Sequence, residues 1–437
     1  MIAETLRLGV AGLGTVGAGV LTLVNEHAEM LSRRAGRRLV VTAVSARDRN
    51  KERGLDLEGI AWFEDPVQIA RDPHVDVVLE LIGGSEGVAK SLVETALAEG
   101  KHVVTANKAL IAVHGPALAA MADQNGLALA FEAAVAGGIP AIKGVRDGLA
   151  ANPLTAVYGI LNGTCNYILT EMRETGREFA DVLAEAQALG YAEADPSFDV
   201  DGIDAAHKLA ILAGLSFNGQ VTFHDLYVEG IGQISAIDIA YAEELGFRIK
   251  LLGIARQHKT RSNRVELRVH PCMVPLDMPI ASVEGVFNAV VAQGGPVDQV
   301  MMVGRGAGAG PTASAVVADV IDIARGIRAP TLGIPTDMLP PLLPVPIDER
   351  VGAYYVRMRV VDQAGVIADI GAAMRDQGVS IESFLQKGRS TVGGTVLVIL
   401  VTHECAEANL RRALALITGA STVVDDPLLI RIEPLGA

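Results

Sequence analysis

The stretch LRLGVAGLGTVGAGVLTLV, residues 6–24, decides how the N-terminal part of the chain folds. An apolar run leads into GLGTVG (12–17) and a helix-like run follows it, so the order is strand, glycine turn and helix. Glycines in such a turn permit a tight bend and a close approach of pyrophosphate, and the N–H groups that open the helix favour phosphate. The predicted cofactor contacts lie within this motif: Gly12, Gly14, Thr15, Val16 and Gly17. The motif therefore favours dinucleotide binding over the alternative, a glycine turn without a ligand.

The end of the second predicted strand bears on which dinucleotide is bound. LVVTAVSA (39–46) is followed by Arg47, and no carboxylate occurs before Asp48. An acidic residue at this point usually holds the free ribose 2′-hydroxyl of NAD, whereas an arginine can hold the 2′-phosphate of NADP. Arg47 therefore favours NADP over NAD, with a solvated surface arginine as the alternative.

Strands and helical stretches keep alternating through the first third of the chain. VDVVLELIGG (75–84), a helix near 87–99 and KHVVTANKAL (101–110) predict an α/β fold with a Rossmann-like, doubly wound parallel sheet. Ligands bind beyond the carboxyl ends of such strands. This places Thr105 and Lys108 near a bound nicotinamide.

Composition excludes several kinds of partner. The chain has 437 residues, a net charge of −14 and 50% apolar residues, which argues against nucleic acid or an anionic membrane as the main partner. Three scattered cysteines without a CxxC pair argue against a disulfide framework or a zinc site and favour a cytoplasmic protein. Neither a signal peptide nor a membrane-spanning run is predicted.

An isolated carboxylate stands in the run FEAAVAGGIP (131–140). Glu132 is surrounded by apolar residues, so its charge needs a partner. The glycine-rich loop after it could turn several carbonyls toward a hard cation. A carboxylate capped by backbone N–H groups is an equally strong alternative on these residues alone.

The segment GYAEADPSFDVDGIDAAHK (190–208) concentrates acidic residues just before an apolar helix. Asp204 and Lys208 share one stripe of that helix, and the stripe continues with apolar residues. We interpret Glu193, Asp199 and Asp204 as partners for a substrate ammonium group, and Lys208 as a proton carrier in the pocket. The alternative is a solvated i,i+4 salt bridge.

Cys165 lies where an apolar strand breaks into a helix, within GILNGTCNYIL (159–169). A helix N-terminus can activate a thiol. No partner histidine is evident, and a small buried cysteine is the commoner case, so a structural role is expected.

With these segments identified, the chain resembles a homoserine dehydrogenase of the long type that carries an ACT domain. The resemblance rests on GLGTVG, VVTANK, FEAAVAGGIP, GILNGTCNYIL, the acidic segment and GRGAGAGPTASAV (304–316), which span about residues 6–328 in this order. It implies NAD(P)-linked interconversion of L-homoserine and L-aspartate 4-semialdehyde, on the route to threonine and methionine. The family's proton-transferring lysine then matches Lys208, its second lysine matches Lys108, and Glu193 and Asp204 match substrate contacts.

The resemblance also implies a sodium site and two cofactor contacts. Glu132 and the carbonyls of Val135, Gly137 and Ile139 match the family's sodium ligands, and Thr105 and Gly306 match residues that contact the cofactor. Residues 1–134 are expected to form a dinucleotide-binding domain that residues 305–330 complete. Residues 135–304 are expected to form an α+β substrate and dimerisation domain. A proline-rich linker over 331–350 and a regulatory domain over 351–437 are expected to follow. A homodimer or homotetramer is expected.

The C-terminal region predicts β-α-β-β-α-β and resembles an ACT domain, a module that binds small amino acids. Its strands are expected near 355–362, 379–387, 394–402 and 421–433, with GRSTVGG (388–394) as a hairpin. Asp362 and Gly365 match the family's first turn, but Ala364 replaces the usual proline. We expect L-threonine as an effector here, with a domain that only dimerises as the alternative.

Two rival functions remain at this point. A phosphorylating semialdehyde dehydrogenase would use Cys165 as its nucleophile. A non-catalytic amino-acid sensor would keep the dinucleotide fold only as a scaffold. The set formed by Lys108, Glu193, Asp204 and Lys208 speaks against the sensor, which has no need of paired proton carriers.

Overall fold

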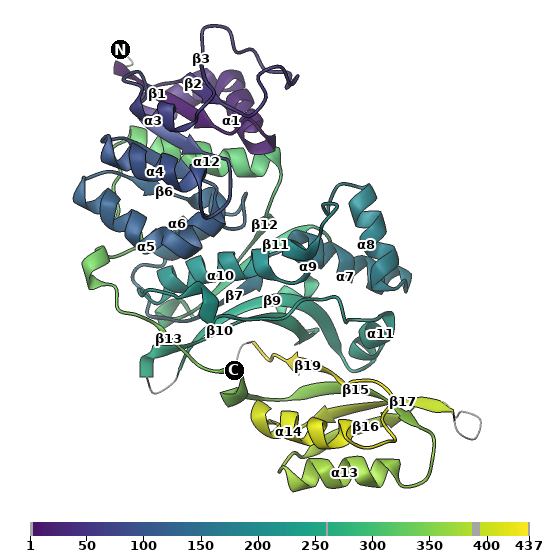
Figure 1. Ribbon diagram of the computed structural model, residues 1–437. Helices are drawn as coiled ribbons and strands as arrows, with labels where there is room; N and C mark the ends of the chain where they lie inside the picture. The colour runs from purple at the N-terminus through teal and green to yellow at the C-terminus, as the bar shows by residue number, and fades with distance from the viewer. Residues whose placement is uncertain (1–2, 259–260, 387–393, 436–437) are drawn as a thin grey trace.

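The computed structural model describes residues 3–258, 261–386 and 394–435. A sheet built from the N-terminal residues lies at one end of the molecule, a second sheet occupies the middle, and the C-terminal domain lies at the other end (Figure 1). Within the described residues, no helix is both long and apolar enough to cross a membrane.

The N-terminal sheet has six parallel strands in the order β3-β2-β1-β4-β5-β6. Its strands are β1 (Ala3–Ala11), β2 (Arg37–Ser45), β3 (Ala61–Phe63), β4 (Val77–Glu80), β5 (His102–Thr105) and β6 (Leu129–Ala130). This order reverses between β1 and β4, which is where a doubly wound fold binds its dinucleotide. The predicted fold class is confirmed.

Two helices far apart in the sequence pack together on this sheet (Figure 1). They are α1 (Thr15–Glu26) and α12 (Ala309–Ala324), and Val20, Val316 and Val320 share one buried core between them. The other helices of this region are α2 (Ala28–Ala35), α3 (Val67–Arg71), α4 (Val88–Ala98) and α5 (Lys108–Gln124). The chain therefore returns to its first domain after building the second.

The middle region is a mixed sheet whose core strands are antiparallel. They are β7 (Leu154–Ile160), β9 (Phe247–His258), β10 (Arg261–Pro275), β11 (Phe287–Gly294) and β12 (Gln299–Arg305), with β8 (Tyr227–Val228) added to β10. Its helices are α6 (Ala141–Lys143), α7 (Gly163–Thr175), α8 (Phe179–Ala188), α9 (Ser197–Val200), α10 (Ile203–Ser216) and α11 (Ala236–Glu244). Nearly every residue of α10 is buried, which fits a helix that is apolar on most sides.

The C-terminal region has the predicted order of strands and helices. It consists of β15 (Tyr354–Val361), α13 (Val366–Asp376), β16 (Ile381–Gln386), β17 (Thr395–Thr402), α14 (Glu407–Thr418) and β19 (Leu428–Ile432), with β14 (Val351–Gly352) and β18 (Cys405–Ala406) paired beside them. All of the predicted hairpin GRSTVGG except its last glycine lies outside the described residues. The βαββαβ prediction is confirmed.

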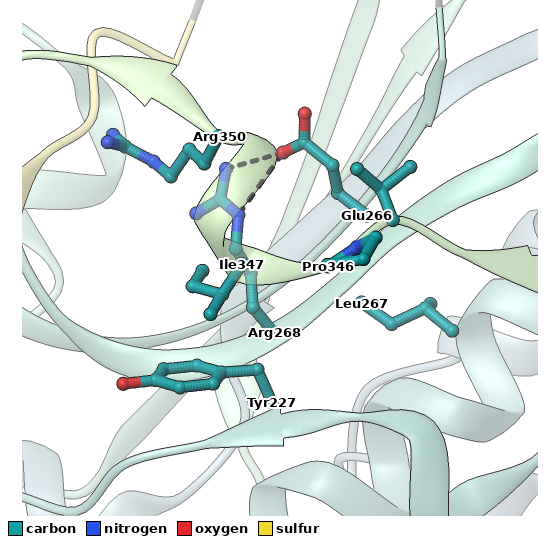
Figure 2. Close-up of a pocket in the computed structure, with 8 residues that line it drawn as sticks. Tyr227, Glu266, Leu267, Arg268, Pro346, Ile347 and Arg350 are labelled. Carbon is teal, nitrogen blue, oxygen red and sulfur yellow. Dashed lines mark hydrogen bonds and ion pairs between the residues drawn. The ribbon is translucent and has the colours of Figure 1, made fainter. Parts of the chain in front are cut away.

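One strand joins the C-terminal domain to the middle sheet. β19 pairs with β15 on one side and with β10 on the other, so both regions share an eleven-stranded sheet. Glu433, just past β19, accepts from Arg268 (Nη1–Oε1 2.7 Å) and from Arg350 (Nη2–Oε1 2.8 Å), and all three side chains are buried. Figure 2 shows Arg268 reaching Glu266 above Tyr227 at this junction.

The proline-rich segment 331–350 lies against the middle region and is not a free spacer. Leu339 and Leu342 are buried, and β13 (Leu343–Pro344) pairs with β10. Proline cannot donate a backbone hydrogen bond, so the segment is confined to the edge of the sheet. Its buried leucines explain why the segment packs against the domain, because exposing them to water would cost free energy.

Candidate functional site

The glycine turn after β1 is shaped to receive a phosphate. Gly12 has a φ of +102°, and a Cβ on Gly17 would lie 1.9 Å from the carbonyl oxygen of Gly12, so neither position tolerates a side chain. A Cβ on Gly14 would meet nothing within 4 Å, which leaves open space beside the backbone. Gly14 is the N-cap of α1, and no side chain caps the first N–H groups of that helix. These groups can donate to a pyrophosphate.

Arginines follow the end of β2. Arg47 is exposed, and Ser45 occupies the position where an acidic residue would hold a ribose 2′-hydroxyl. Arg53 was not predicted: its Nε donates to the carbonyl of Leu13 (3.2 Å), which ties this loop to the glycine turn. The signal in the sequence was the density of arginines after Arg47.

The carboxyl ends of β4 and β5 are held by hydrogen bonds that fix Lys108. Thr105 donates its hydroxyl to Glu80 (2.6 Å) and accepts the N–H of Asn107 (2.9 Å). Asn107 then caps α5 by accepting the N–H of Leu110 (3.1 Å). Lys108 is the first residue of α5, so its side chain leaves the edge of the sheet where ligands bind.

Two lysines meet on one carboxylate at the centre of the molecule. Lys208 Nζ lies 2.6 Å from Asp204 Oδ2, and Lys108 Nζ lies 3.0 Å from Asp204 Oδ1. Lys208 Nζ also donates to the carbonyl of Leu161 (2.7 Å). Asp204 and Lys208 do form the i,i+4 salt bridge of the alternative interpretation. However, Lys208 is only 8% exposed and Asp204 only 4%, so this salt bridge does not lie on a solvated helix face.

We call Lys108, Asp204 and Lys208 the lysine–aspartate centre. Asn162 connects this centre to a second carboxylate. Its Nδ2 donates to Asp199 Oδ1 (2.7 Å) and to Asp204 Oδ2 (2.9 Å), while its Oδ1 caps α7 by accepting the N–H of Cys165 (2.8 Å). Sequence analysis missed Asn162, although an asparagine directly before a helix is a common cap. It fixes the end of β7 and both aspartates in one network.

The two aspartates of this network have pKa values shifted in opposite directions. Burial alone would raise the pKa of Asp204, but the charges of Lys208 and Lys108 outweigh it and hold this pKa well below the ordinary value. Burial and the charge of Asp204 raise the pKa of Asp199. Asp204 therefore remains ionised between two cations, and Asp199 takes up a proton more readily.

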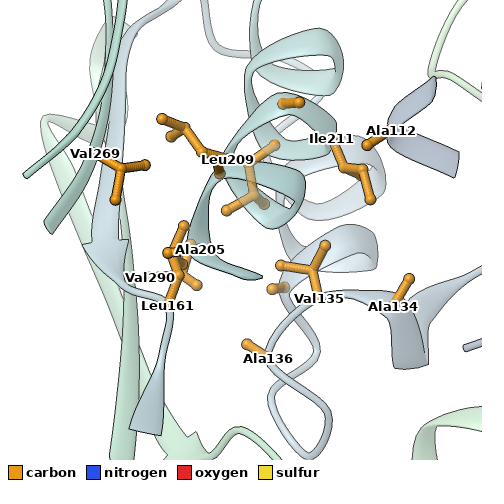
Figure 3. Packing of buried hydrophobic residues seen from close by; sticks show 14 of the residues in the cluster. Ala112, Ala134, Val135, Ala136, Leu161, Ala205, Leu209, Ile211, Val269 and Val290 are labelled. Carbon is orange, nitrogen blue, oxygen red and sulfur yellow. The ribbon is translucent and has the colours of Figure 1, made fainter. Parts of the chain in front are cut away.

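An aromatic stack borders the centre. The ring of His207 lies between those of Phe198 and Phe223, with centroids 5.7 Å and 4.1 Å away, and Lys108 Nζ lies 5.5 Å from the centroid of Phe198. Phe198 is 44% exposed, so its ring can face a ligand. Behind the centre, α10 packs through Ala205, Leu209 and Ile211 into the main hydrophobic cluster (Figure 3).

Glu193 lies outside the lysine–aspartate centre, and Cys165 is buried. Glu193 is exposed, and within the described residues its side chain forms no hydrogen bond or ion pair with Lys108, Lys208 or Asp204. The Cys165 thiol is fully buried, and burial raises its pKa well above the ordinary value. Cys165 is therefore a poor nucleophile, and the structural role expected for it fits its surroundings.

Glu132 has the backbone partners of the predicted alternative. Its carboxylate accepts the N–H of Ile142 and the N–H of Lys143, both at 2.9 Å. Burial and the nearby Asp319 raise the pKa of Glu132 to about 7. Two backbone donors thus only partly offset the cost of burying this carboxylate.

The loop beside Glu132 also offers oxygen atoms to a cation. Val135 and Gly137 are buried, and within the described ranges no N–H donates to their carbonyls, whereas the Ile139 carbonyl accepts the N–H of Ala141 (2.7 Å). No cluster of three or more His, Cys, Asp or Glu side chains in the same ranges could hold a metal ion. Carbonyl ligands with one carboxylate therefore fit a singly charged hard cation better than a transition metal.

Gly306 closes the cofactor side of this loop. The N–H of Gly138 donates to the carbonyl of Arg305 (2.9 Å), and a Cβ on Gly137 would lie 2.6 Å from the carbonyl oxygen of Gly306. A Cβ on Gly306 would collide with Asn288 at 2.3 Å.

In the C-terminal domain, Gly365 has a φ of +101° and opens α13, three residues after Asp362.

A dinucleotide fold with a buried lysine–aspartate centre at its edge defines an NAD(P)-dependent oxidoreductase. Comparison with known families agrees: residues 12–132 match "Homoserine dehydrogenase, NAD binding domain", residues 140–321 match "Homoserine dehydrogenase", and residues 354–415 match "ACT domain". The homoserine dehydrogenase of Pseudomonas aeruginosa is 47% identical over 99% of this chain and 100% of its own length. The chain belongs to the homoserine dehydrogenase family.

Solved structures agree with this assignment. The homoserine dehydrogenase of Thiobacillus denitrificans is 46% identical, covers 99% of both chains and superposes with a TM-score of 0.92. A hyperthermophilic archaeal homoserine dehydrogenase mutant, solved in complex with NADPH, is 26% identical over 73% of this chain and 97% of its own, with a TM-score of 0.62. The predicted family and activity are confirmed, and both rival functions are set aside.

Proposed function

We propose that Lys208 carries the proton in the interconversion of L-homoserine and L-aspartate 4-semialdehyde. In the direction of oxidation, the substrate hydroxyl gives its proton to the neutral amine of Lys208 as the hydroxyl-bearing carbon loses a hydride. A bound nicotinamide would supply the acceptor for this hydride. In the reverse direction, Lys208 returns the proton to the substrate oxygen.

The position of Lys208 in the lysine–aspartate centre carries this proposal. In the ammonium form, which returns the proton to the substrate oxygen, Lys208 has three donors, and two of them are used by Asp204 and the carbonyl of Leu161. The third is left for the substrate oxygen. Lys108, at the carboxyl end of β5, stands on the nicotinamide side and keeps Asp204 ionised.

The acidic residues are proposed to hold the substrate ammonium group. Asp199 lies beside Asp204 in the Asn162 network. Glu193 would join them only after a movement of its exposed loop. Lys108 is the second candidate for the proton carrier, because it contacts the same carboxylate.

Replacing each lysine separately tests these roles. Lys208→Ala is expected to lower kcat by about 10²- to 10⁴-fold, the usual contribution of general acid–base catalysis. Its Kd for NADP, measured by quenching of Trp62 fluorescence, should stay near that of the wild type. Near-normal turnover in Lys208→Ala together with a large loss in Lys108→Ala would assign the proton to Lys108.

NADP is proposed as the preferred cofactor, with NAD as the alternative. The exposed Arg47 and the absence of a carboxylate at the end of β2 support a 2′-phosphate site. The NADPH complex of the archaeal relative supports the proposal of NADP too.

A sodium ion is proposed between Glu132 and the carbonyls of Val135, Gly137 and Ile139, where it would neutralise a buried charge beside the cofactor loop.

Regulation and assembly are proposed from the remaining parts of the chain. L-Threonine is proposed to bind at the first turn of the ACT domain, near Asp362 and Gly365, and to inhibit the enzyme. A homodimer or homotetramer is proposed through the middle sheet, because β12 is an edge strand and Val303 on it is exposed.

A further inference from the structure

Glu80, the last residue of β4, is a buried carboxylate that is held without a cation. Its side chain is fully buried, and within the described residues it forms no ion pair with a lysine, arginine or histidine. A buried charge is costly unless other groups compensate it. Here hydrogen bonds do so: Oε1 accepts the N–H of Ile82 (2.8 Å) and of Gly83 (3.0 Å), and Oε2 accepts the hydroxyl of Thr105 (2.6 Å). The carboxylate therefore joins the ends of two neighbouring strands.

The bonds to Oε1 shape the loop 81–84, which follows β4. Gly83 and Gly84 have φ values of +92° and +88°, and a Cβ on either would meet nothing within 4 Å, so open space lies beside their backbone. The same loop packs on the glycine turn, because a Cβ on Gly12 would lie 2.4 Å from the carbonyl oxygen of Leu81. In a doubly wound fold the half of the sheet that begins with β4 binds the second mononucleotide. The loop 81–84 therefore borders the nicotinamide side of the cofactor site.

The bond to Oε2 leads to Lys108. Thr105 Oγ1 accepts the N–H of Asn107 (2.9 Å), and Asn107 Nδ2 donates to the carbonyl of Gly84 (2.7 Å). These bonds close a ring that runs from Glu80 through Thr105 and Asn107 back to the loop. Asn107 is also the N-cap of α5, so the ring fixes where this helix begins and from where Lys108 reaches the lysine–aspartate centre.

We propose that Glu80 is a positioning residue for the dehydrogenase reaction, which holds the loop 81–84 and Lys108 in one frame. A carboxylate suits this position because it only accepts hydrogen bonds, so it satisfies all three donors at once. A glutamine of the same shape keeps an oxygen for the two N–H groups but turns an NH₂ group toward the hydroxyl of Thr105. The proposal rests on the proposed place of Lys108 in the site and holds whichever lysine carries the proton.

Glu80→Gln and Glu80→Ala separate the two sides of the ring. In Glu80→Gln we expect kcat for homoserine to fall about tenfold or more, because a displacement of about 1 Å can cost ~10²-fold in rate. Its Kd for NADP, measured by quenching of Trp62 fluorescence, should stay within about twofold of the wild type, since the amide oxygen still accepts from the loop. Glu80→Ala removes both sides, so its Kd should also become about tenfold weaker.

A double-mutant cycle with Thr105→Val tests whether the two residues act through one bond. Thr105→Val already removes the partner of Glu80, so the double variant Glu80→Gln/Thr105→Val should lose no more kcat than Thr105→Val alone. Independent losses would multiply instead. Thr105→Ser keeps the hydroxyl and should retain most of the kcat that Thr105→Val loses.

Asp238→Asn is the matched control. Asp238 is also fully buried and also accepts a backbone N–H and a hydroxyl, both from Ser235, but it lies on α11 in the middle region. The variant should have a lower Tm, with kcat for homoserine and Kd for NADP unchanged.

The proposal is overturned if Glu80→Gln and Thr105→Val keep normal kcat, or if their losses multiply in the double variant. It is also overturned if Asp238→Asn loses as much kcat as Glu80→Gln at an equal loss of Tm. Should Glu80→Ala not fold, the other variants decide. A large loss of kcat in Lys108→Ala with normal turnover in Glu80→Gln would leave the proposed role of Lys108 standing and would remove Glu80 from its support.

Discussion

Asp204 shows how a buried charge is made tolerable in this protein. It is almost completely buried, yet Lys208, Lys108 and Asn162 all donate to it. Removing one partner of a buried ion pair usually costs more than the pair contributes, because the other charge stays buried without compensation. Each of these donors therefore positions the others, and a change at one should be felt at the reacting atoms.

Asn162→Ala tests this coupling. The variant loses the cap of α7 and the donor to Asp199 and Asp204, so we expect kcat for homoserine to fall by about 10²-fold through misplacement of the centre. The KM for NADP should change little. Steady-state kinetics with each substrate varied in turn separates the two effects.

Asn166→Ala provides the matched control on the same helix. Its Nδ2 bonds the carbonyls of Val283, Gly285 and Phe287 and not the aspartates. It should lose stability with a much smaller loss of kcat. Equal losses of kcat in both variants would mean that Asn162 acts only through the stability of α7.

Arg47→Ala tests the choice of cofactor. Losing a charge-assisted contact with the 2′-phosphate should raise the KM for NADP about tenfold or more and leave the KM for NAD unchanged. NAD serves as the internal control, since it lacks that phosphate. An unchanged preference for NADP would remove Arg47 from this role and direct attention to Arg53.

At the scale of elements, the loop between β6 and α6 is the least regular part of the site. Ala136 has a φ of +54°, unusual for a residue with a side chain, and Gly137 follows at +31°. Such backbone costs on the order of 1–3 kcal/mol and persists where its surroundings require it. Here it leaves the Val135 and Gly137 carbonyls without N–H donors beside Glu132, as a cation site needs.

The sodium proposal predicts a specific salt effect on stability. At equal ionic strength and alkaline pH, the wild type should have a higher Tm in sodium chloride than in choline chloride, because only sodium can enter the loop. Glu132→Gln should show no such difference, since the charge that attracts the ion is gone. Identical Tm values for the wild type in both salts would argue against the site.

At the scale of the whole molecule, the regulatory domain is built into the catalytic one. β19 continues the middle sheet into the C-terminal domain (Figure 1), and a buried network of arginines and carboxylates surrounds it. A rearrangement of one domain therefore has to involve the other. Buried ion pairs of this kind depend on the ionisation of their carboxylates.

Acid should weaken this junction. Burial would raise the pKa of Glu433, but the charges of Arg268 and Arg350 lower it to about 2. A lowered carboxylate pKa stabilises the fold above the unfolded value of about 4.3, and this stability is lost as pH falls toward 2. A shift of this size corresponds to roughly 3 kcal/mol.

Denaturation of the wild type and of Glu433→Gln between pH 6 and pH 2.5 measures this contribution. The wild type should be the more stable protein at pH 6, and the difference should shrink as pH falls below about 4.3. Arg359→Gln, which removes an exposed ion pair with Asp425, is a control whose difference should stay small at every pH. A constant gap between the wild type and Glu433→Gln would show that Glu433 does not titrate in this range.

Local patterns in the sequence predicted much of the fold. GLGTVG, the alternating strands and helices, and the period-two strand of the C-terminal region all act over short stretches, so they determined the Rossmann-like sheet and the βαββαβ order. Asp204 and Lys208 could be paired, and Lys108 placed near the nicotinamide, because helix stripes and strand ends place side chains predictably. Family resemblance supplied the reaction.

Tertiary structure decided what depends on contacts between distant residues. Asn162 joins Asp199 and Asp204 across about forty positions of chain, and no spacing rule anticipates such a bond. Glu193 was predicted with them, but burial and not composition separates the members of this acidic segment: Asp204 is buried against the lysines, whereas Glu193 and Asp201 are exposed. The sequence alone thus determined the elements and their chemistry, whereas long-range packing determined which charges meet.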